Sequence, residues 1–167
     1  MQTPCLHIDL GKIEHNARRI VGLCRRHGID VAGVTKVTCG HPGVARAMLR
    51  GGVGTIADSR LENLRRLRAD GVGARLMLLR VPPLSQVEAV VQGADISLNS
   101  ELAVLAALSG AALQQGRVHD VILMVDLGDR REGILPRQAA IELAEQRVRR
   151  AMSYRRWSLF SSAPGFV

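Results

Sequence analysis

Lysine is rare in this chain, and one of its two lysines stands where a reactive amine could be built. The 23 basic residues include only two lysines, Lys12 and Lys36. Lys36 lies in the apolar segment 31–38, where lysine has poor strand propensity and a buried ammonium is costly without a partner. A lysine desolvated at the end of a strand loses its proton more readily and can condense with an aldehyde. The alternative is a lysine whose stem lines the strand while its ammonium reaches solvent.

Other polar side chains follow the predicted strands and could contact a ligand. His41 could meet a phosphate or a substrate, or it could cap the helix that begins beside it. Asn99 admits the same two interpretations, and Arg131 lies in a charged loop that could simply be exposed. Ser59 and Arg80 complete the set of candidate substrate or phosphate contacts.

Sequence motifs for other chemistries are missing. No GxxxxGK[ST] or GxGxxG occurs, so nucleotide binding has no support from motifs. The three cysteines, Cys5, Cys24 and Cys39, form no C-x-x-C pair, and the five histidines do not stand at metal-ligand intervals. We therefore expect free thiols and no metal.

The elements that would position these side chains alternate regularly along the chain. Short runs rich in Val, Ile and Leu, nearly continuous in their apolarity, are typical of strands covered on both faces. Helical patterns separate them, Asp9 is placed to cap the first helix, and Ser59 with Glu62 and Ser85 with Glu88 have capping-box spacing. The first helix presents Ile13, Ile20, Val21 and Cys24 on one face. The expected strands are 30–37, 53–57, 74–81, 94–98 and 119–127, and the expected helices are 10–27, 43–49, 59–69, 85–92 and 100–115.

Repeated βα units predict a parallel sheet with right-handed crossovers, either an open doubly wound sheet or a barrel. In both folds the functional groups gather at the carboxyl ends of the strands. Lys36, Ser59, Arg80, Asn99 and Arg131 all fall at or just after such ends. We expect them at one edge of the sheet.

Composition changes abruptly near residue 147. Residues 1–146 contain no aromatic side chain, whereas 147–167 hold all four, together with five arginines and no acid. A helix is predicted over 136–146. Beyond it the sequence shows neither the alternation of a strand nor the 3.6-residue apolar stripe of a helix. A foreign C-terminus, such as a shifted reading frame produces, accounts for both changes, and we expect 147–167 to be an irregular basic tail outside the fold. The alternative is a tail that docks on a protein partner or RNA.

Overall charge and hydropathy limit the remaining classes of function. The net charge of +8 comes mostly from the tail, so we expect no nucleic-acid partner for the rest of the chain. The longest nearly apolar run, 102–113, is interrupted and too short for a membrane span. The N-terminus lacks the basic and apolar regions of a secretion signal, which predicts a cytoplasmic protein.

Five segments carry a resemblance to a known family. IDLGKIEHNARRI, VTKVTCGHP, ADSRLENLRRLR, MLLRVPPLSQVEAVVQGADISLNSEL and VHDVILMVDLGDRREGI occur in this order between residues 5 and 146. They closely resemble the amino-acid racemases of the alanine racemase-like fold, in particular the ornithine racemase type. The resemblance implies a TIM-type (β/α) barrel of pyridoxal-phosphate (PLP) fold type III, of which this chain would supply about five βα units.

The resemblance also assigns roles to residues. It implies that Lys36 forms the aldimine with PLP and is one of two bases for racemising an amino acid, ornithine or another basic one. It adds Arg131 near the active site, and we include Asn99 among the cofactor contacts. The second base in related alanine racemases is a tyrosine of a partner subunit in a homodimer, whereas the single tyrosine here, Tyr154, lies in the tail. Met124 stands where many alanine racemases have a carbamylated lysine, so that feature is not carried over.

Length predicts that the barrel is incomplete, since a full one needs about 250 residues. We expect residues 1–146 to be a truncated N-terminal barrel with two unpaired edges, and the 167-residue chain alone to be inactive. Three alternatives stay open: a PLP-binding barrel without catalysis, an aldolase or decarboxylase on the same fold, and an interaction protein that uses the basic tail.

Overall fold

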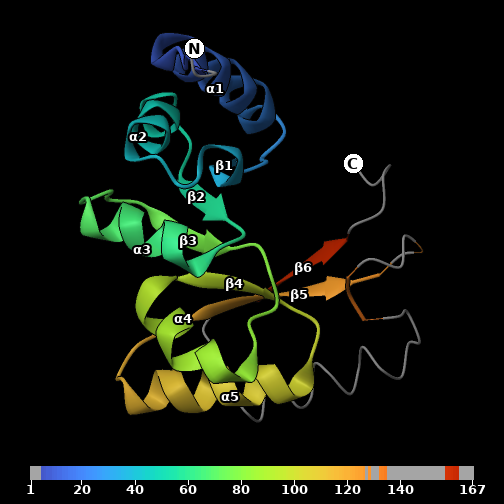
Figure 1. Cartoon of the computed structure of the whole chain (residues 1–167). Coiled ribbons are helices and arrows are strands. Elements are labelled where there is room, and N and C mark those ends of the chain that lie inside the picture. Colours follow the sequence, from blue (N-terminus) through green and yellow to red (C-terminus); the bar gives the residue numbers. More distant parts are fainter. Residues whose placement is uncertain (1–4, 127, 129–131, 135–156, 162–167) are drawn as a thin grey trace.

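A computed structural model describes residues 5–126, 128, 132–134 and 157–161 of the chain. Helices and strands alternate along it (Figure 1). The elements are α1 (Leu10–Arg25), β1 (Ala32–Val34), α2 (Pro42–Arg50), β2 (Thr55–Asp58), α3 (Leu61–Ala69), β3 (Arg75–Leu78), α4 (Val87–Gly93), β4 (Ile96–Asn99), α5 (Leu102–Gln114), β5 (Asp120–Val125) and β6 (Trp157–Ser161), with short 3₁₀ helices η1 (Lys36–Thr38) and η2 (Leu84–Gln86).

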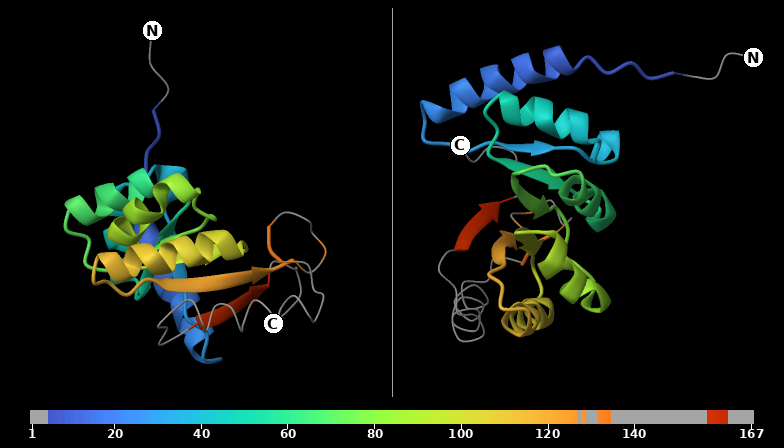
Figure 2. Two further views of the ribbon diagram at one scale, coloured as in Figure 1. Left: turned by 90° about the horizontal axis from the view of Figure 1, so that it is seen from below. Right: turned by 90° about the vertical axis from the view of Figure 1, so that its left-hand side faces the viewer.

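The strands form one parallel sheet in which each strand pairs with the next in chain order, from β1 to β6. Every βα connection therefore steps to the neighbouring strand in the same direction, which is the connectivity of a barrel wall. Figure 2 shows the resulting curved sheet with α2 to α5 on its outer side. The predicted partial barrel of alternating strands and helices is confirmed.

The core lies between the sheet and these helices. Ile56 and Leu76 are paired across β2 and β3, and both are fully buried. They belong to one cluster with Leu64 and Leu67 of α3 and Val90 of α4. Gly33 faces the same layer, because a Cβ there would lie 2.7 Å from the Met48 sulfur of α2 and 3.2 Å from Val53. Side chains alternate along a strand, so the residues beside these positions face the concave side.

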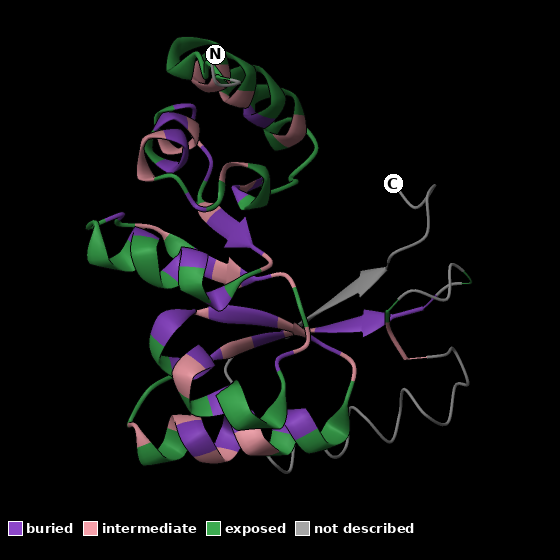
Figure 3. Cartoon of the chain, viewed as in Figure 1, coloured by how far each residue is buried: buried purple, intermediate pink, exposed green. Residues whose placement is uncertain are grey.

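Helix α1 is attached differently from the others. Its N-cap is confirmed, since Asp9 accepts a hydrogen bond from the Lys12 backbone N–H at 3.0 Å. Its predicted apolar face is only partly used, because Val21 is buried while Ile20 is 52% exposed. The helix packs on α2 rather than on the sheet, so most of its surface is exposed (Figure 3).

The predicted capping boxes are wrong. Helix α3 begins after Arg60, and the side chain of Asp58, not Ser59, accepts the Arg60 backbone N–H at 3.0 Å. Ser85 lies within η2, and the helix that follows has no side-chain cap. A buried carboxylate at the end of β2 is a stronger acceptor than a serine hydroxyl, which explains the first difference.

Beyond residue 146 the composition predicts an irregular segment, and the structure contains strand β6. It runs parallel to β5, with Trp157 opposite Val121 and Ser161 opposite Val125. The helix expected over 136–146 lies outside the described residues. In the described part of the chain, none of the helices is sufficiently long and apolar to cross a bilayer.

Candidate active site

All strands run the same way, so the residues that follow them meet at one edge of the sheet, here called the carboxyl edge. Lys36 follows β1, Ser59 and Arg60 follow β2, Arg80 follows β3, and Ser100 follows β4. The topology thus brings four predicted site positions, Lys36, Ser59, Arg80 and Asn99, to the same edge. Arg131 lies outside the described residues.

Lys36 opens the turn that leaves β1. The preceding residue, Thr35, is fully buried and faces the helix layer, where it bonds Asp58. Strand β1 ends at Val34 and Thr35 already has a ψ of 0°, so strand alternation does not assign Lys36 to either side of the sheet. The Lys36 side chain is exposed, so the expected desolvated lysine is not found. The reason is that η1 lifts the chain out of the strand immediately at Lys36.

The turn after Lys36 has an unusual backbone. Cys39 and Gly40 have φ values of 51° and 64°, both in the left-handed region. The carbonyl of Thr35 accepts the backbone N–H groups of Thr38 at 2.9 Å and Gly40 at 3.2 Å. Arg66 of α3 donates to the Cys39 carbonyl at 2.8 Å. The turn is thus closed on itself and tied to the neighbouring βα unit.

Three further candidates differ in whether their side chains already have a partner: His41, Ser59 and Arg80. His41 caps α2, because its Nδ1 accepts the Gly43 backbone N–H at 3.1 Å, which agrees with the helix-capping interpretation. Ser59 is half-buried, and Arg80 is exposed. Arg80 forms none of the ion pairs found among the described residues, and it is therefore free to meet an anion.

Asn99 lies on the helix side of the sheet. It pairs with Leu123, which packs against Leu105 of α5, so both belong to the helix side of the sheet. Its amide donates to the backbone oxygen of Ser97 at 3.1 Å and to the Ser97 hydroxyl at 2.9 Å. It does not cap α5, whose N-cap is Glu101. Both hydrogen bonds of its amide therefore lie between the sheet and the helices.

A histidine that the sequence analysis did not single out completes this buried group. His119 Nε2 lies 2.8 Å from the Ser97 hydroxyl, and its Nδ1 lies 3.1 Å from the Ala94 carbonyl oxygen. Nδ1 therefore carries the proton that bonds the carbonyl, and Nε2 accepts from serine. Burial lowers the pKa of His119 below its usual value because the charged imidazolium would lose its hydration. No sequence motif marks this pair, since 22 positions separate its members.

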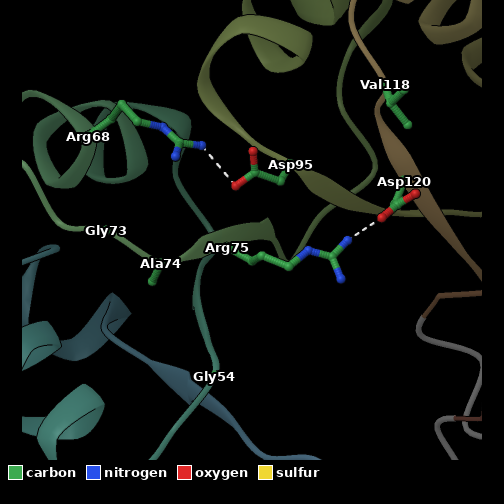
Figure 4. Close-up of a pocket in the computed structure, with 8 residues that line it drawn as sticks. All are labelled: Gly54, Arg68, Gly73, Ala74, Arg75, Asp95, Val118 and Asp120. Carbon is green, nitrogen blue, oxygen red and sulfur yellow. Dashed lines mark hydrogen bonds and ion pairs between the residues drawn. The ribbon is translucent and has the colours of Figure 1, made fainter.

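The opposite, amino edge of the sheet holds a pocket of about 550 Å³ (Figure 4). Two ion pairs cross it. Arg75 at the start of β3 reaches Asp120 at the start of β5, and Arg68 of α3 bonds Asp95 at 2.8 Å. Asp95 also accepts the Leu76 backbone N–H at 2.7 Å. The arginines drawn in this pocket are therefore already matched by carboxylates.

The carboxyl edge carries exposed cations that lie outside the ion pairs of the described residues. Lys36, Arg60 and Arg80 at the carboxyl edge are exposed, and none belongs to an ion pair among the described residues. Unpaired cations beside a primary amine suit a ligand that carries both an anionic group and a carbonyl.

Comparison with known proteins identifies the family. Residues 8–158 match the family model described as alanine racemase, N-terminal domain. The ornithine racemase of Acetoanaerobium sticklandii is 45% identical over 130 residues, which cover 78% of this chain and 36% of the relative. The lysine racemase of Thermotoga maritima is 36% identical over 147 residues, covering 88% and 42%. The chain belongs to the alanine racemase N-terminal domain family.

Solved structures agree on the fold. The alanine racemase of E. faecalis superposes with a TM-score of 0.76 at 26% identity, covering 93% of this chain and 42% of that one. The D-threonine aldolase of Filomicrobium marinum superposes with a TM-score of 0.78 at 20% identity, a likeness of fold alone. The chain spans about two fifths of the length of these relatives. Family members are PLP-dependent racemases.

Proposed function

We propose that this chain provides the PLP-holding half of an amino-acid racemase barrel, with Lys36 as the residue that holds the cofactor. The observation that carries the proposal is the position of Lys36: it is an exposed primary amine just after β1, at the same edge of the sheet as Arg60 and Arg80, which belong to none of the ion pairs among the described residues. The residues present fit PLP, which has an aldehyde for an amine and a phosphate for cations. When bound, PLP withdraws electrons from the substrate and so acidifies its α C–H bond.

The side chains of the carboxyl edge have different roles in this proposal. Lys36 Nζ would hold the cofactor, and as a free amine it would take or return the substrate's α-proton on one face. Arg80 is proposed to contact the phosphate or the substrate carboxylate, because it is exposed and belongs to none of the ion pairs among the described residues. We keep Arg131 as a site residue and give Asn99 an indirect role, since its amide is used within β4. A second base, for the opposite face, is proposed to come from a partner subunit.

For the substrate we propose a basic amino acid. The relatives that support this are an ornithine racemase and a lysine racemase, each matched over more than three quarters of the chain. Alanine racemases also match, at 34% identity for that of Mycobacterium avium, so the choice is between basic and small amino acids. That the 167-residue chain alone does not racemise stays a prediction.

The test uses the scarcity of lysine. The purified chain is incubated with PLP and then with borohydride, which reduces the C=N bond formed from the lysine amine and the aldehyde with loss of water. Peptide mass spectrometry then compares the pyridoxyl label at Lys36 with that at Lys12, an internal control whose side chain is 82% exposed on α1. We expect strong preference for Lys36 at low PLP, and loss of the saturable label in Lys36→Ala. Equal labelling of the two lysines would contradict the proposal.

A further inference from the structure

Asp58 is a fully buried carboxylate beside the proposed cofactor lysine. It ends β2, and three donors surround it: the Thr35 hydroxyl at 2.8 Å, the Arg60 backbone N–H at 3.0 Å and the Asn63 side-chain amide at 2.9 Å. A buried charge is tolerated only when hydrogen bonds replace its hydration. These contacts supply that replacement, and they come from two different βα units.

Thr35 connects Asp58 to the turn that carries Lys36. Its backbone N–H donates to the Ala57 carbonyl at 3.0 Å, and its own carbonyl accepts the N–H groups of Thr38 and Gly40. The Thr38 hydroxyl donates to the same carbonyl at 3.0 Å. The first residue of the turn is therefore held by its side chain to Asp58 and by its main chain to β2. Lys36 follows it directly.

Asn63 holds the far end of the same turn. A Cβ added to Gly40 would lie 2.7 Å from the Asn63 Cβ and 3.0 Å from its Cα and its carbonyl oxygen. Gly40 is thus pressed against the helix residue whose amide bonds Asp58. One carboxylate is therefore in contact with both supports of the turn, Thr35 before Lys36 and Asn63 behind Gly40.

We propose that Asp58 is a positioning residue for Lys36, acting through Thr35 and Asn63 to hold the turn 35–40, and with it the backbone from which the Lys36 side chain starts, in one conformation. The proposal rests on the proposed function of Lys36 in holding PLP. Asp58 itself does not contact the cofactor in this assignment. Its effect is mechanical: an exposed, flexible lysine chain reacts in one place only if its backbone origin is fixed.

Thr35 offers the sharpest pair of variants. Thr35→Val removes the hydroxyl while it keeps the shape, and Thr35→Ser keeps the hydroxyl. Asp95→Asn is the matched control, since Asp95 also accepts a backbone N–H and an arginine, but at the amino edge. Each variant is first checked for native circular dichroism. Hydrogen exchange of the 36–40 amides is then measured without PLP, and the Lys36 to Lys12 label ratio is measured with it across pH.

The positioning role predicts a specific set of results. Thr35→Val should speed exchange of the 36–40 amides and lower the label ratio about tenfold, the effect of losing a hydrogen bond to a charged group. The pH profile of Lys36 labelling should move toward that of Lys12. Thr35→Ser should restore both within about twofold, and Asp95→Asn should change neither beyond that margin. If Thr35→Val does not fold, Asp58→Asn, which keeps the shape and two acceptor contacts, should give the same changes at smaller size.

The failures can be told apart. Equal labelling of Lys36 and Lys12 in the unaltered chain would reject the PLP role of Lys36, while the exchange rates would still decide whether Asp58 holds the turn. Preferential labelling that persists unchanged in Thr35→Val, with an unmoved pH profile, would overturn the positioning role and leave the PLP role intact. A variant that only lowers stability, without changing exchange of the 36–40 amides in its folded state, would overturn it as well.

Discussion

The two edges of the sheet differ in what their buried and half-buried carboxylates bind. At the amino edge, Arg75 and Arg68 are matched by Asp120 and Asp95. At the carboxyl edge, the buried carboxylate of Asp58 is occupied by Thr35 and neutral amide groups, and the cations nearby form no ion pair among the described residues.

This difference indicates which arginines can bind an anionic ligand. A matched arginine must give up its carboxylate before it can take another anion, whereas an unmatched one gives up only water. A cavity of about 550 Å³ lies at the amino edge, and two matched ion pairs cross it. Parallel α/β folds place their sites at the carboxyl edge instead.

The largest effect should come from the turn that supports Lys36. Gly40→Ala forces a side chain into a backbone with φ of 64° and against Asn63, so we expect about 2–4 kcal/mol lower unfolding free energy. Gly54→Ala at the amino edge, where an added Cβ meets no atom within 4 Å, should change it by less than about 0.5 kcal/mol. Urea unfolding measures both. Equal effects would mean that the two edges are equally tolerant.

The next effect concerns the phosphate. Arg80→Met should weaken PLP binding about tenfold if the arginine meets the phosphate through a charge-assisted hydrogen bond. Arg75→Met at the amino edge should leave binding unchanged, because Arg75 is already paired with Asp120. Titration followed by absorbance gives the apparent Kd, and competition by inorganic phosphate should be weaker in Arg80→Met. A reversed ranking would place the anion at the amino edge.

A smaller effect depends on pH. The folded chain holds His119 with a pKa below its usual 6.5, so below that pH the unfolded chain binds a proton that the folded chain does not. The contribution of His119 to the unfolding free energy should therefore be fully present above about pH 7. As the pH drops below 6.5 the unfolding free energy should fall by at most about 1.4 kcal/mol per pH unit. Urea midpoints from pH 7.5 to 5 measure the slope. His119→Gln should flatten it, and an unchanged slope would exclude His119 as its source.

The smallest effect should come from the amino-edge ion pairs. Arg75 and Asp120 are partly exposed, so Arg75→Met should cost less than about 1 kcal/mol and less still in high salt. Asp95→Asn should cost more, because Asp95 also accepts a backbone N–H from β3. Unfolding at two salt concentrations separates the two. If Arg75→Met lowered the unfolding free energy by a large amount that did not depend on salt, the amino edge would be a packed core rather than a surface screened by solvent.

Much of the fold could be predicted from pattern, because strand and helix periods depend on local spacing. The five predicted strands and five of the six predicted helices were found, the sixth, 136–146, lying outside the described residues. The first strand is shorter than expected, since η1 begins at Lys36. The caps were less predictable. Ser59 has the right spacing, but the helix begins after Arg60 and the Asp58 carboxylate accepts the Arg60 backbone N–H, and only the packed structure shows which acceptor is used.

The candidate site shows the same division. Lys36 could be selected from its rarity and its place in an apolar run, and the comparisons confirm the racemase family. Asn99 could not be oriented, because strand alternation must be counted from a known face and that face is set by α5. The interaction of Asp58 with Thr35 and the pairing of Ser97 with His119 join residues 23 and 22 positions apart, with no motif to mark them.

The amino-acid sequence by itself determined the alternation of strands and helices, the candidate amine and the family, because each depends on residue types at short spacing. Only the tertiary structure decided which side of the sheet Asn99 faces, which arginines pair with carboxylates, and what holds the turn at Lys36. Those properties arise between βα units, where strand register and helix packing bring distant residues within hydrogen-bonding distance.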